Sequence, residues 1–241
     1  MKRDPRTDTP NFWNYARDYL HAYMPKVRGL SGKTIQAYRI SLESYLDYLA
    51  SQQQIERQHV TFEHFDRRHL KAWITWMKTE KQYAPKTIKL RLSAIKAFLT
   101  YAACEDISLV AFSEAAKTLP APTEPKSPIE YLTETETRAI LTAFTGQTEK
   151  SRRNRMLLIF LYDTAARVGE ITSLTLQDIN MTHPGRVTLT GKRSKTRIVP
   201  LTDKTIEHLR IYLSEFHQHP GKHSGARPLF YSRHQIGRAH V

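Results

Sequence analysis

The stretch that decides the fold reads DTAARVGEITSLTLQDI, from Asp163 to Ile179. It directly follows the most apolar run of the chain, Met156–Tyr162, which predicts a central helix that is buried all round. Because Arg167 ends this buried element, its guanidinium can be held rigidly and can grip two oxygens of one phosphate. Glu170 stands one helical turn later, so the residues alone also allow a surface ion pair of small energetic value.

A basic stretch, GKRSKTRIVPL, runs from Gly191 to Leu201. Apolar and polar residues alternate before it from Val187 on, and apolar residues follow it, which predicts a β-hairpin. A lysine that a hairpin pushes into a groove can donate a proton, whereas an ordinary solvated basic turn would do nothing. The tip of this hairpin is expected to carry four cations: Lys192, Arg193, Lys195 and Arg197.

The first half of the chain reads as helices. Apolar residues recur at helical spacing from Phe12, after Ser31, after Asp66 and after Pro85. Four such stripes must bury one another, so a compact helical bundle is expected.

The second half adds a helix that begins at Thr133 and another that carries Ile206 to Phe216. Between the halves lies a polar stretch with four prolines, which favours extended chain. We therefore expect a first domain over 1–118, a linker over 119–128 and a second domain over 129–241.

The charge indicates a polyanionic partner. Lys and Arg outnumber Asp and Glu 37 to 23, which gives a formal net charge of +14. The excess is +7 up to Lys126 and +7 after it, so both halves share a positive field. A merely basic, soluble protein is the alternative.

Other classes are excluded by composition. Cys104 is the only cysteine, so an internal disulfide or a thiolate metal cluster is impossible. The polar N-terminus is no secretory signal, and the longest apolar run is far shorter than the roughly 20 residues that span a bilayer. A cytoplasmic protein without a membrane segment is expected.

Together the two quoted stretches resemble the tyrosine recombinase (phage integrase, site-specific integrase) family. That family has Arg-x-x-Glu-hydrophobic-x-x-Leu-x-x-x-Asp-Ile, followed by a hairpin with Gly-Lys-x-x-Lys-x-Arg-x-Val-Pro-Leu. One departure is Ala165-Ala166, where small residues including glycine usually precede the arginine.

Residues 29–38 and 83–93 resemble the two helix starts of the family's core-binding domain, each with a Lys-Thr pair in the first turn. Such turns bind phosphates well, although ordinary N-capping is the alternative. The expected DNA contacts are Lys33, Thr34, Lys86, Thr87, Arg91, Arg193 and Lys195.

The resemblance covers almost the whole chain. It implies a mainly α fold with a small β-sheet: an N-terminal helical (SAM-like) core-binding bundle plus a truncated α+β catalytic domain. In this family a tyrosine attacks a DNA phosphate, which leaves a 3′-phosphotyrosyl link and a free 5′-hydroxyl, without metal or other cofactor. The implied partners are double-stranded DNA and further copies of the protein, as a tetramer on paired sites.

By position, Arg167 corresponds to the first catalytic arginine and Lys192 to the hairpin lysine. Glu170 would orient the site, and Asp178 would be structural. The family's His-x-x-Arg, its further His or Trp and its tyrosine nucleophile come later in the chain. No residue here is assigned to those roles, because His234 is followed by Gly237 at the arginine position and Tyr231 is misplaced.

We therefore expect a site-specific recombinase or integrase that is truncated at its C-terminus and does not cleave DNA as given. Residues from about 235 to 241 are expected not to be native. The alternative is a non-cleaving DNA-binding protein of the same fold that regulates or competes, and a more distant third is a basic RNA-binding or regulatory protein. For His217 and His219 a solvated helix end is favoured over a metal site.

Overall fold

Aromatic side chains hold the first part of the chain together. The computed structural model describes residues 9–123, 128, 130–144, 148–191, 194–217 and 224–230. Contacts divide the chain into two units, Met1–Pro128 and Ile129–Val241, and each unit has a hydrophobic core of its own. Leu119, at the start of the proposed linker, is buried in the core of the first unit. The linker over 119–128 stays a prediction.

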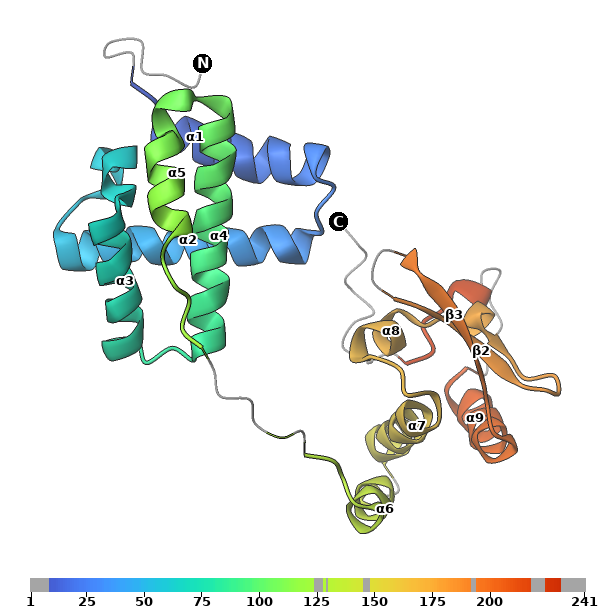
Figure 1. Ribbon diagram of the computed structural model, residues 1–241. Coiled ribbons are helices and arrows are strands. Elements are labelled where there is room, and N and C mark those ends of the chain that lie inside the picture. The colour runs from blue at the N-terminus through green and yellow to red at the C-terminus, as the bar shows by residue number, and fades with distance from the viewer. Residues whose placement is uncertain are drawn as a thin grey trace. The chain divides into compact units, whose positions relative to one another are not determined.

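The first unit consists of helices. Two of them, α2 and α4, are long and pack across one another, while α5 runs back alongside α4 (Figure 1). The elements are α1 (Phe12–Asp18), a π-helical segment (Tyr19–Val27), α2 (Gly32–Gln53), short 3-10 turns (Arg57–His59, Phe62–Phe65 and Ile107–Leu109), α3 (Arg67–Thr79), α4 (Pro85–Glu105) and α5 (Val110–Lys117).

The starts of three helices follow from local chemistry, as predicted. The Ser31 hydroxyl accepts from the Thr34 backbone N–H at 3.3 Å, and an Asp66 carboxylate oxygen accepts from the His69 N–H at 2.8 Å. Pro85 occupies the first turn of α4, where its missing N–H costs nothing. The helical spacing that begins at Phe12 extends to Tyr23, so helix was predicted there, but the sequence indicated neither the π-helical geometry of Tyr19–Val27 nor α5.

Four phenylalanines from three elements form the centre of this unit. Phe12 stacks on Phe65, with ring centroids 5.2 Å apart, and meets Phe98 edge-on at 5.7 Å. Phe62 in turn stacks on Phe98 at 6.0 Å. Because these rings come from α1, the 3-10 turn Phe62–Phe65 and α4, their burial fixes these three elements relative to one another, including α4, which begins next to Lys86.

The second unit combines helices with a small sheet. Its helices are α6 (Glu134–Thr142), α7 (Glu149–Thr164), α8 (Val168–Ser173) and α9 (Asp203–Phe216), and its 3-10 turns are Leu176–Asp178 and Ser224–Ala226. The strands are β1 (Ile179–Asn180), β2 (Arg186–Thr190) and β3 (Thr196–Pro200), antiparallel in the order β1-β2-β3. The predicted hairpin is confirmed, and β1 is an addition to it.

The register of the hairpin decides which side chains face the core. Val187 pairs with Val199, and Leu189 pairs with Arg197. Val187 and Leu189 are fully buried. Since alternate residues of a strand share a face, Arg197 lies on the inner face of the sheet together with Val199.

The prediction that Met156–Tyr162 is buried all round is wrong. In α7 only Met156, Phe160 and Thr164 are buried, and Tyr162 is 68% exposed. The helix packs mainly against α9 and α6, and only one stripe of it enters the core. The predicted fold class is confirmed: the chain is mainly α, with a small antiparallel sheet.

His217 also differs from the expectation of a solvated helix end. It is half-buried, and its Nε2 donates to the Leu229 carbonyl at 3.1 Å. Burial lowers the pKa of this imidazole below its usual value. His219 lies outside the described residues.

Candidate active site and nucleic-acid interface

Arg167 lies where α7 ends and α8 begins. Ala165 closes α7 in the left-handed region, with φ of 47°. This turn redirects the chain, so that Arg167 becomes the extended residue immediately before α8. The departure noted in the sequence thus falls on a backbone position that favours glycine.

Glu170 fixes Arg167 at two points. One Glu170 oxygen, Oε2, accepts from the Arg167 backbone N–H at 2.9 Å, and the other, Oε1, accepts from Arg167 Nη1 at 3.1 Å. The Glu170 side chain is only 3% exposed, whereas that of Arg167 is 79% exposed. A buried carboxylate therefore anchors an outward-facing guanidinium, and the alternative of a simple surface pair does not describe this geometry.

Arg197 binds the same carboxylate from the hairpin. Its Nη1 donates to Glu170 Oε1 at 2.7 Å and its Nη2 to Oε2 at 2.9 Å, which is a bidentate pair. These bonds from Arg197, followed by those from Arg167, hold the pKa of Glu170 at about 2. The carboxylate is therefore ionised at neutral pH.

The hairpin turn also presses against Glu170. A Cβ on Gly191 would lie 2.8 Å from Glu170 Oε1, so only glycine fits without movement. The Gly191 N–H donates to the Lys195 carbonyl at 2.7 Å and closes the turn. The structure thus brings Arg167, Glu170 and the base of the hairpin turn together.

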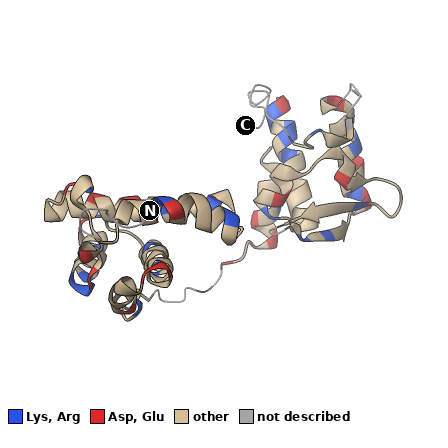
Figure 2. Cartoon of the chain, turned by 90° about the horizontal axis from the view of Figure 1, so that it is seen from above, with Lys and Arg blue, Asp and Glu red and all other residues tan. Residues whose placement is uncertain are grey.

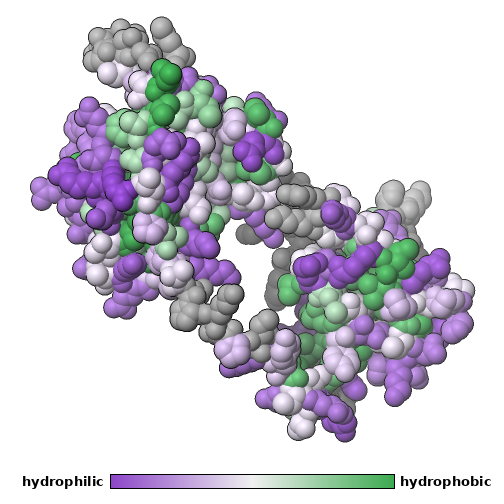
Figure 3. All heavy atoms as spheres, in the orientation of Figure 1, coloured by the Kyte–Doolittle hydropathy of each residue, from purple (hydrophilic) through white to green (hydrophobic). Residues whose placement is uncertain are grey.

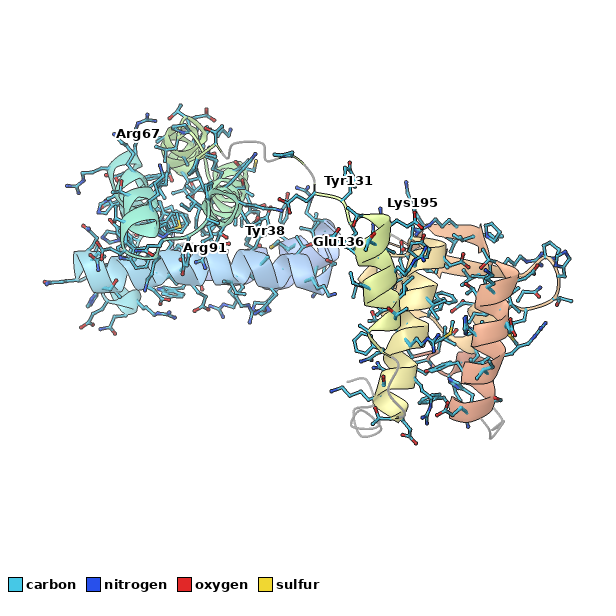
Figure 4. The ribbon with its side chains drawn as sticks, turned by 90° about the horizontal axis from the view of Figure 1, so that it is seen from below. Tyr38, Arg67, Arg91, Tyr131, Glu136 and Lys195 are labelled. Carbon is cyan, nitrogen blue, oxygen red and sulfur yellow. The ribbon has the colours of Figure 1, made fainter. Side chains whose placement is uncertain are left out.

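The other predicted residues of this unit are placed as follows. Lys195 lies in the hairpin connection and is exposed (Figure 4). Lys192 and Arg193 lie outside the described residues. The Asp178 carboxylate accepts from the Thr175 backbone N–H at 2.8 Å and from its hydroxyl at 2.6 Å, which is the structural role expected for it.

The predicted description of Arg197 as one of four cations at the hairpin tip is wrong. Its position opposite Leu189 directs its guanidinium to Glu170, although the side chain remains 40% exposed. The signal was present in the sequence: Arg197 and Val199 have the same parity, so they share one strand face. The sequence could not predict that the Glu170 carboxylate, 27 residues earlier, would pair with the Arg197 guanidinium.

In the first unit, the predicted contacts lie in the first turns of α2 and α4. Lys33 and Lys86 are exposed, and Thr34 and Thr87 are half-buried. The Thr34 hydroxyl lies 3.0 Å from that of Ser31, so the capping interpretation holds for this residue.

Arg91 stacks on Tyr83, with 4.5 Å from its guanidinium carbon to the ring centroid, and Lys81 stacks on Trp76 at 5.0 Å. Both cations line a groove of about 500 Å³ beside α2, to which α2 contributes Arg39. Hydrophilic side chains cover much of the visible face of each unit (Figure 3). Cations on aromatic rings suit contact with phosphates and bases.

Two absences hold for the described ranges. No helix there has both the length and the apolarity to cross a membrane. Within the same part of the chain, His, Cys, Asp and Glu do not gather into a group of three or more that could hold a metal ion.

The arrangement matches a known family. The family model described as "Phage integrase family" matches residues 130–239. The model described as "Phage integrase, N-terminal SAM-like domain" matches residues 18–106. The tyrosine recombinase XerD of Staphylococcus aureus is 31% identical over 207 residues, which cover 86% of this chain and 67% of that protein. The chain belongs to the tyrosine recombinase family. A second tyrosine recombinase, XerD of Vibrio cholerae, is 29% identical over 188 residues, which cover 78% of this chain and 59% of that protein.

Solved tyrosine recombinase structures share the fold. XerH site-specific recombinase, bound to its palindromic difH substrate in a post-cleavage complex, has a TM-score of 0.65 at 20% identity and covers 92% of this chain and 62% of that one. A lambda integrase tetramer bound to a Holliday junction also has a TM-score of 0.65, at 16% identity over 95% of this chain and 62% of that one.

Proposed function

We propose that this chain is part of a site-specific DNA recombinase or integrase that binds duplex DNA and exchanges strands through a 3′-phosphotyrosyl intermediate. One observation carries the proposal. Arg167 presents an exposed guanidinium on a buried, ionised carboxylate, and the lysine-bearing hairpin turn touches that same carboxylate.

The chemistry assigns a role to each group. Arg167 would donate to two non-bridging oxygens of the scissile phosphate, whose negative charge increases when a tyrosine oxygen adds to phosphorus. The bond from phosphorus to the 5′-oxygen then breaks, and Lys192 would supply the proton to that oxygen. Glu170 would hold Arg167 in place. These steps use no metal, and the charge is neutralised by cations of the protein.

DNA binding would involve both units. Each half of the chain carries a net charge of +7, and basic residues lie on helices of both units among acidic ones (Figure 2). In the first unit the exposed first turns of α2 and α4, with Lys33 and Lys86, and the groove with Arg91 suit a phosphate backbone. We propose that the two units hold a DNA duplex as a clamp, and that the complete assembly is a tetramer on paired sites.

The second candidate is a DNA-binding protein of the same fold that does not cleave. Its basis is the charge, since a net excess of +7 in each half suits DNA binding whether or not cleavage follows, and the sequence analysis assigns no residue to the family's His-x-x-Arg. Since that motif supplies the second arginine in the family, its position in the gene decides between the two candidates.

The test starts with DNA binding by the 241-residue chain. Duplexes are enriched from a random library, and their affinity is measured against salt. Each neutralised phosphate should add about −0.9 to the slope of log affinity against log salt. Lys33→Ala and Lys86→Ala should each make the slope less negative. Lys117→Ala should not change the slope, because Lys117 pairs with Glu114 on α5 at 2.7 Å. A salt-independent affinity would contradict DNA binding.

Cleavage is tested with the protein that the whole gene encodes, on the enriched duplex with a nick near its centre. A covalent protein–DNA band on a denaturing gel that Arg167→Ala removes would support the recombinase. Tight binding by that protein without a band would support the non-cleaving candidate.

A further inference from the structure

Glu170 has two arginine partners, and they use their donors differently. Arg197 gives both terminal nitrogens to the carboxylate, at 2.7 and 2.9 Å. Arg167 gives one terminal nitrogen, at 3.1 Å, and its other side-chain nitrogens make no hydrogen bond that the described part of the chain shows. Arg197 is thus committed to Glu170, while Arg167 keeps donors for a ligand.

The two arginines also differ in what holds them. Arg197 is on β3, where ladder bonds to β2 fix the backbone over five residue pairs. Arg167 is on a turn between helices, and its side chain is 79% exposed. The rigid element therefore carries the arginine that binds Glu170 most firmly.

We propose that Arg197 is a positioning residue, which orients the Glu170 carboxylate and through it fixes the Arg167 guanidinium for a phosphate diester. The role of Arg167 toward phosphate rests on the proposed function, whereas the orientation of Arg167 by Arg197 does not. The same carboxylate contacts Gly191, so Arg197 also couples the hairpin turn to the position of Arg167.

The charges agree with this role. With only Arg167 beside it, an ionised Glu170 would neutralise the positive charge of the Arg167 guanidinium, which is the charge that would attract a phosphate. With Arg197 added, two guanidiniums and one carboxylate leave a net charge of +1. Lysine at position 197 would keep that charge but lose the planar fork that sets the carboxylate's orientation.

The experiment uses the 241-residue chain and nitrogen NMR of the arginine Nε–Hε groups, with inorganic phosphate as the probe. The Arg167 signal is assigned by its loss in Arg167→Lys. In the wild type it should show restricted motion and should shift as phosphate is added. In Arg197→Gln the signal should become mobile, and the apparent Kd for phosphate at Arg167 should rise about tenfold, by analogy with metal ligands that lose an orienting partner.

Arg152→Gln is the matched control. Arg152 pairs with Glu215 at 2.5 Å in the same unit, so its loss removes an ion pair without touching Glu170. It should leave the Arg167 signal and its phosphate response as in the wild type. Arg197→Lys should restore folding fully and the order of Arg167 only in part.

An Arg167 signal with unchanged motion in Arg197→Gln would overturn the proposal. Where Arg197→Gln does not fold, Arg197→Lys decides: a wild-type Arg167 signal there overturns the proposal, and a mobile one supports it. A wild-type Arg167 that ignores phosphate but loosens in Arg197→Gln would contradict the proposed function while leaving the positioning role intact.

Discussion

Gly191 lies directly against Glu170: a Cβ on the glycine would approach the carboxylate oxygen Oε1 to 2.8 Å. The carboxylate is held in place, because Arg197 donates to both of its oxygens and Arg167 also donates to both. This contact explains why a glycine precedes the hairpin lysine. It also ties the turn of the hairpin to the start of α8.

Gly191→Ala should destabilise the second unit by about 1–3 kcal/mol, because overpacking against a fixed neighbour forces the backbone or the ion pair to move. The matched control is Gly169→Ala in α8, where a Cβ meets nothing within 4 Å. That change should be neutral or slightly stabilising, since alanine favours helix over glycine.

Both variants are compared by urea unfolding followed by far-UV circular dichroism. The three tryptophans, Trp13, Trp73 and Trp76, all lie in the first unit, so their fluorescence reports that unit separately and serves as an internal control. Equal urea midpoints for Gly191→Ala and the wild type would show that the close approach to Glu170 is relieved without loss of unfolding free energy.

The pH dependence of stability follows from Glu170. Its pKa is lowered from 4.5 to about 2, so the folded state favours the ionised carboxylate. The contribution of the ionised Glu170 carboxylate to the free energy of unfolding is therefore fully present above about pH 4.5 and is lost as the pH falls toward 2. Arg197→Gln removes the largest cause of the shift.

The difference in unfolding free energy between the wild type and Arg197→Gln should thus be constant above about pH 5 and shrink below pH 4.5. Urea unfolding at a series of pH values measures it. If the unfolding free energies of the wild type and Arg197→Gln, plotted against pH, remain parallel down to pH 2.5, then the Arg197–Glu170 pair does not set the pKa of Glu170.

Much of the fold was predictable because its signals are local. Ser31, Asp66, Pro85 and Thr133 each mark a helix start by a hydrogen bond or a backbone preference within one turn. The hairpin was predictable because alternation has a period of two. The site was only partly predictable, since Arg197 and Gly191 acquire their roles through Glu170, a residue distant in sequence. The exposure of α7 depends on which elements cover it, and no periodicity in a uniformly apolar run reveals that.

Ala165 offers a separate test of the turn before Arg167. It adopts a left-handed conformation with φ of 47°, which costs an L-residue about 1–2 kcal/mol. Ala165→Gly removes this cost. It also lowers the free energy of unfolding by about 0.5–1 kcal/mol, because glycine gives the unfolded chain more conformational freedom. The net expectation is a second unit more stable by about 0.5–1 kcal/mol, again measured by urea unfolding. Ala166→Gly, at a neighbour without a positive φ, should destabilise instead, and the same sign for both variants would contradict the argument.

The last prediction separates Arg167 from Lys192 in a form of the protein that cleaves DNA. Arg167→Ala should leave DNA affinity within about tenfold of the wild type, because many cations share the binding energy. Its cleavage rate should fall by about 10²–10³ or more, since the charge that the guanidinium would hold develops only as the tyrosine oxygen adds to phosphorus. Lys192→Ala should also slow cleavage, but for another reason: the departing 5′-oxygen lacks its proton. A substrate with sulfur in place of that bridging oxygen needs no proton on leaving. Sulfur should therefore restore cleavage by Lys192→Ala and leave Arg167→Ala slow, as measured by the rate of covalent adduct formation on denaturing gels. Rescue of both variants, or of neither, would show that the two residues do not divide the reaction in this way.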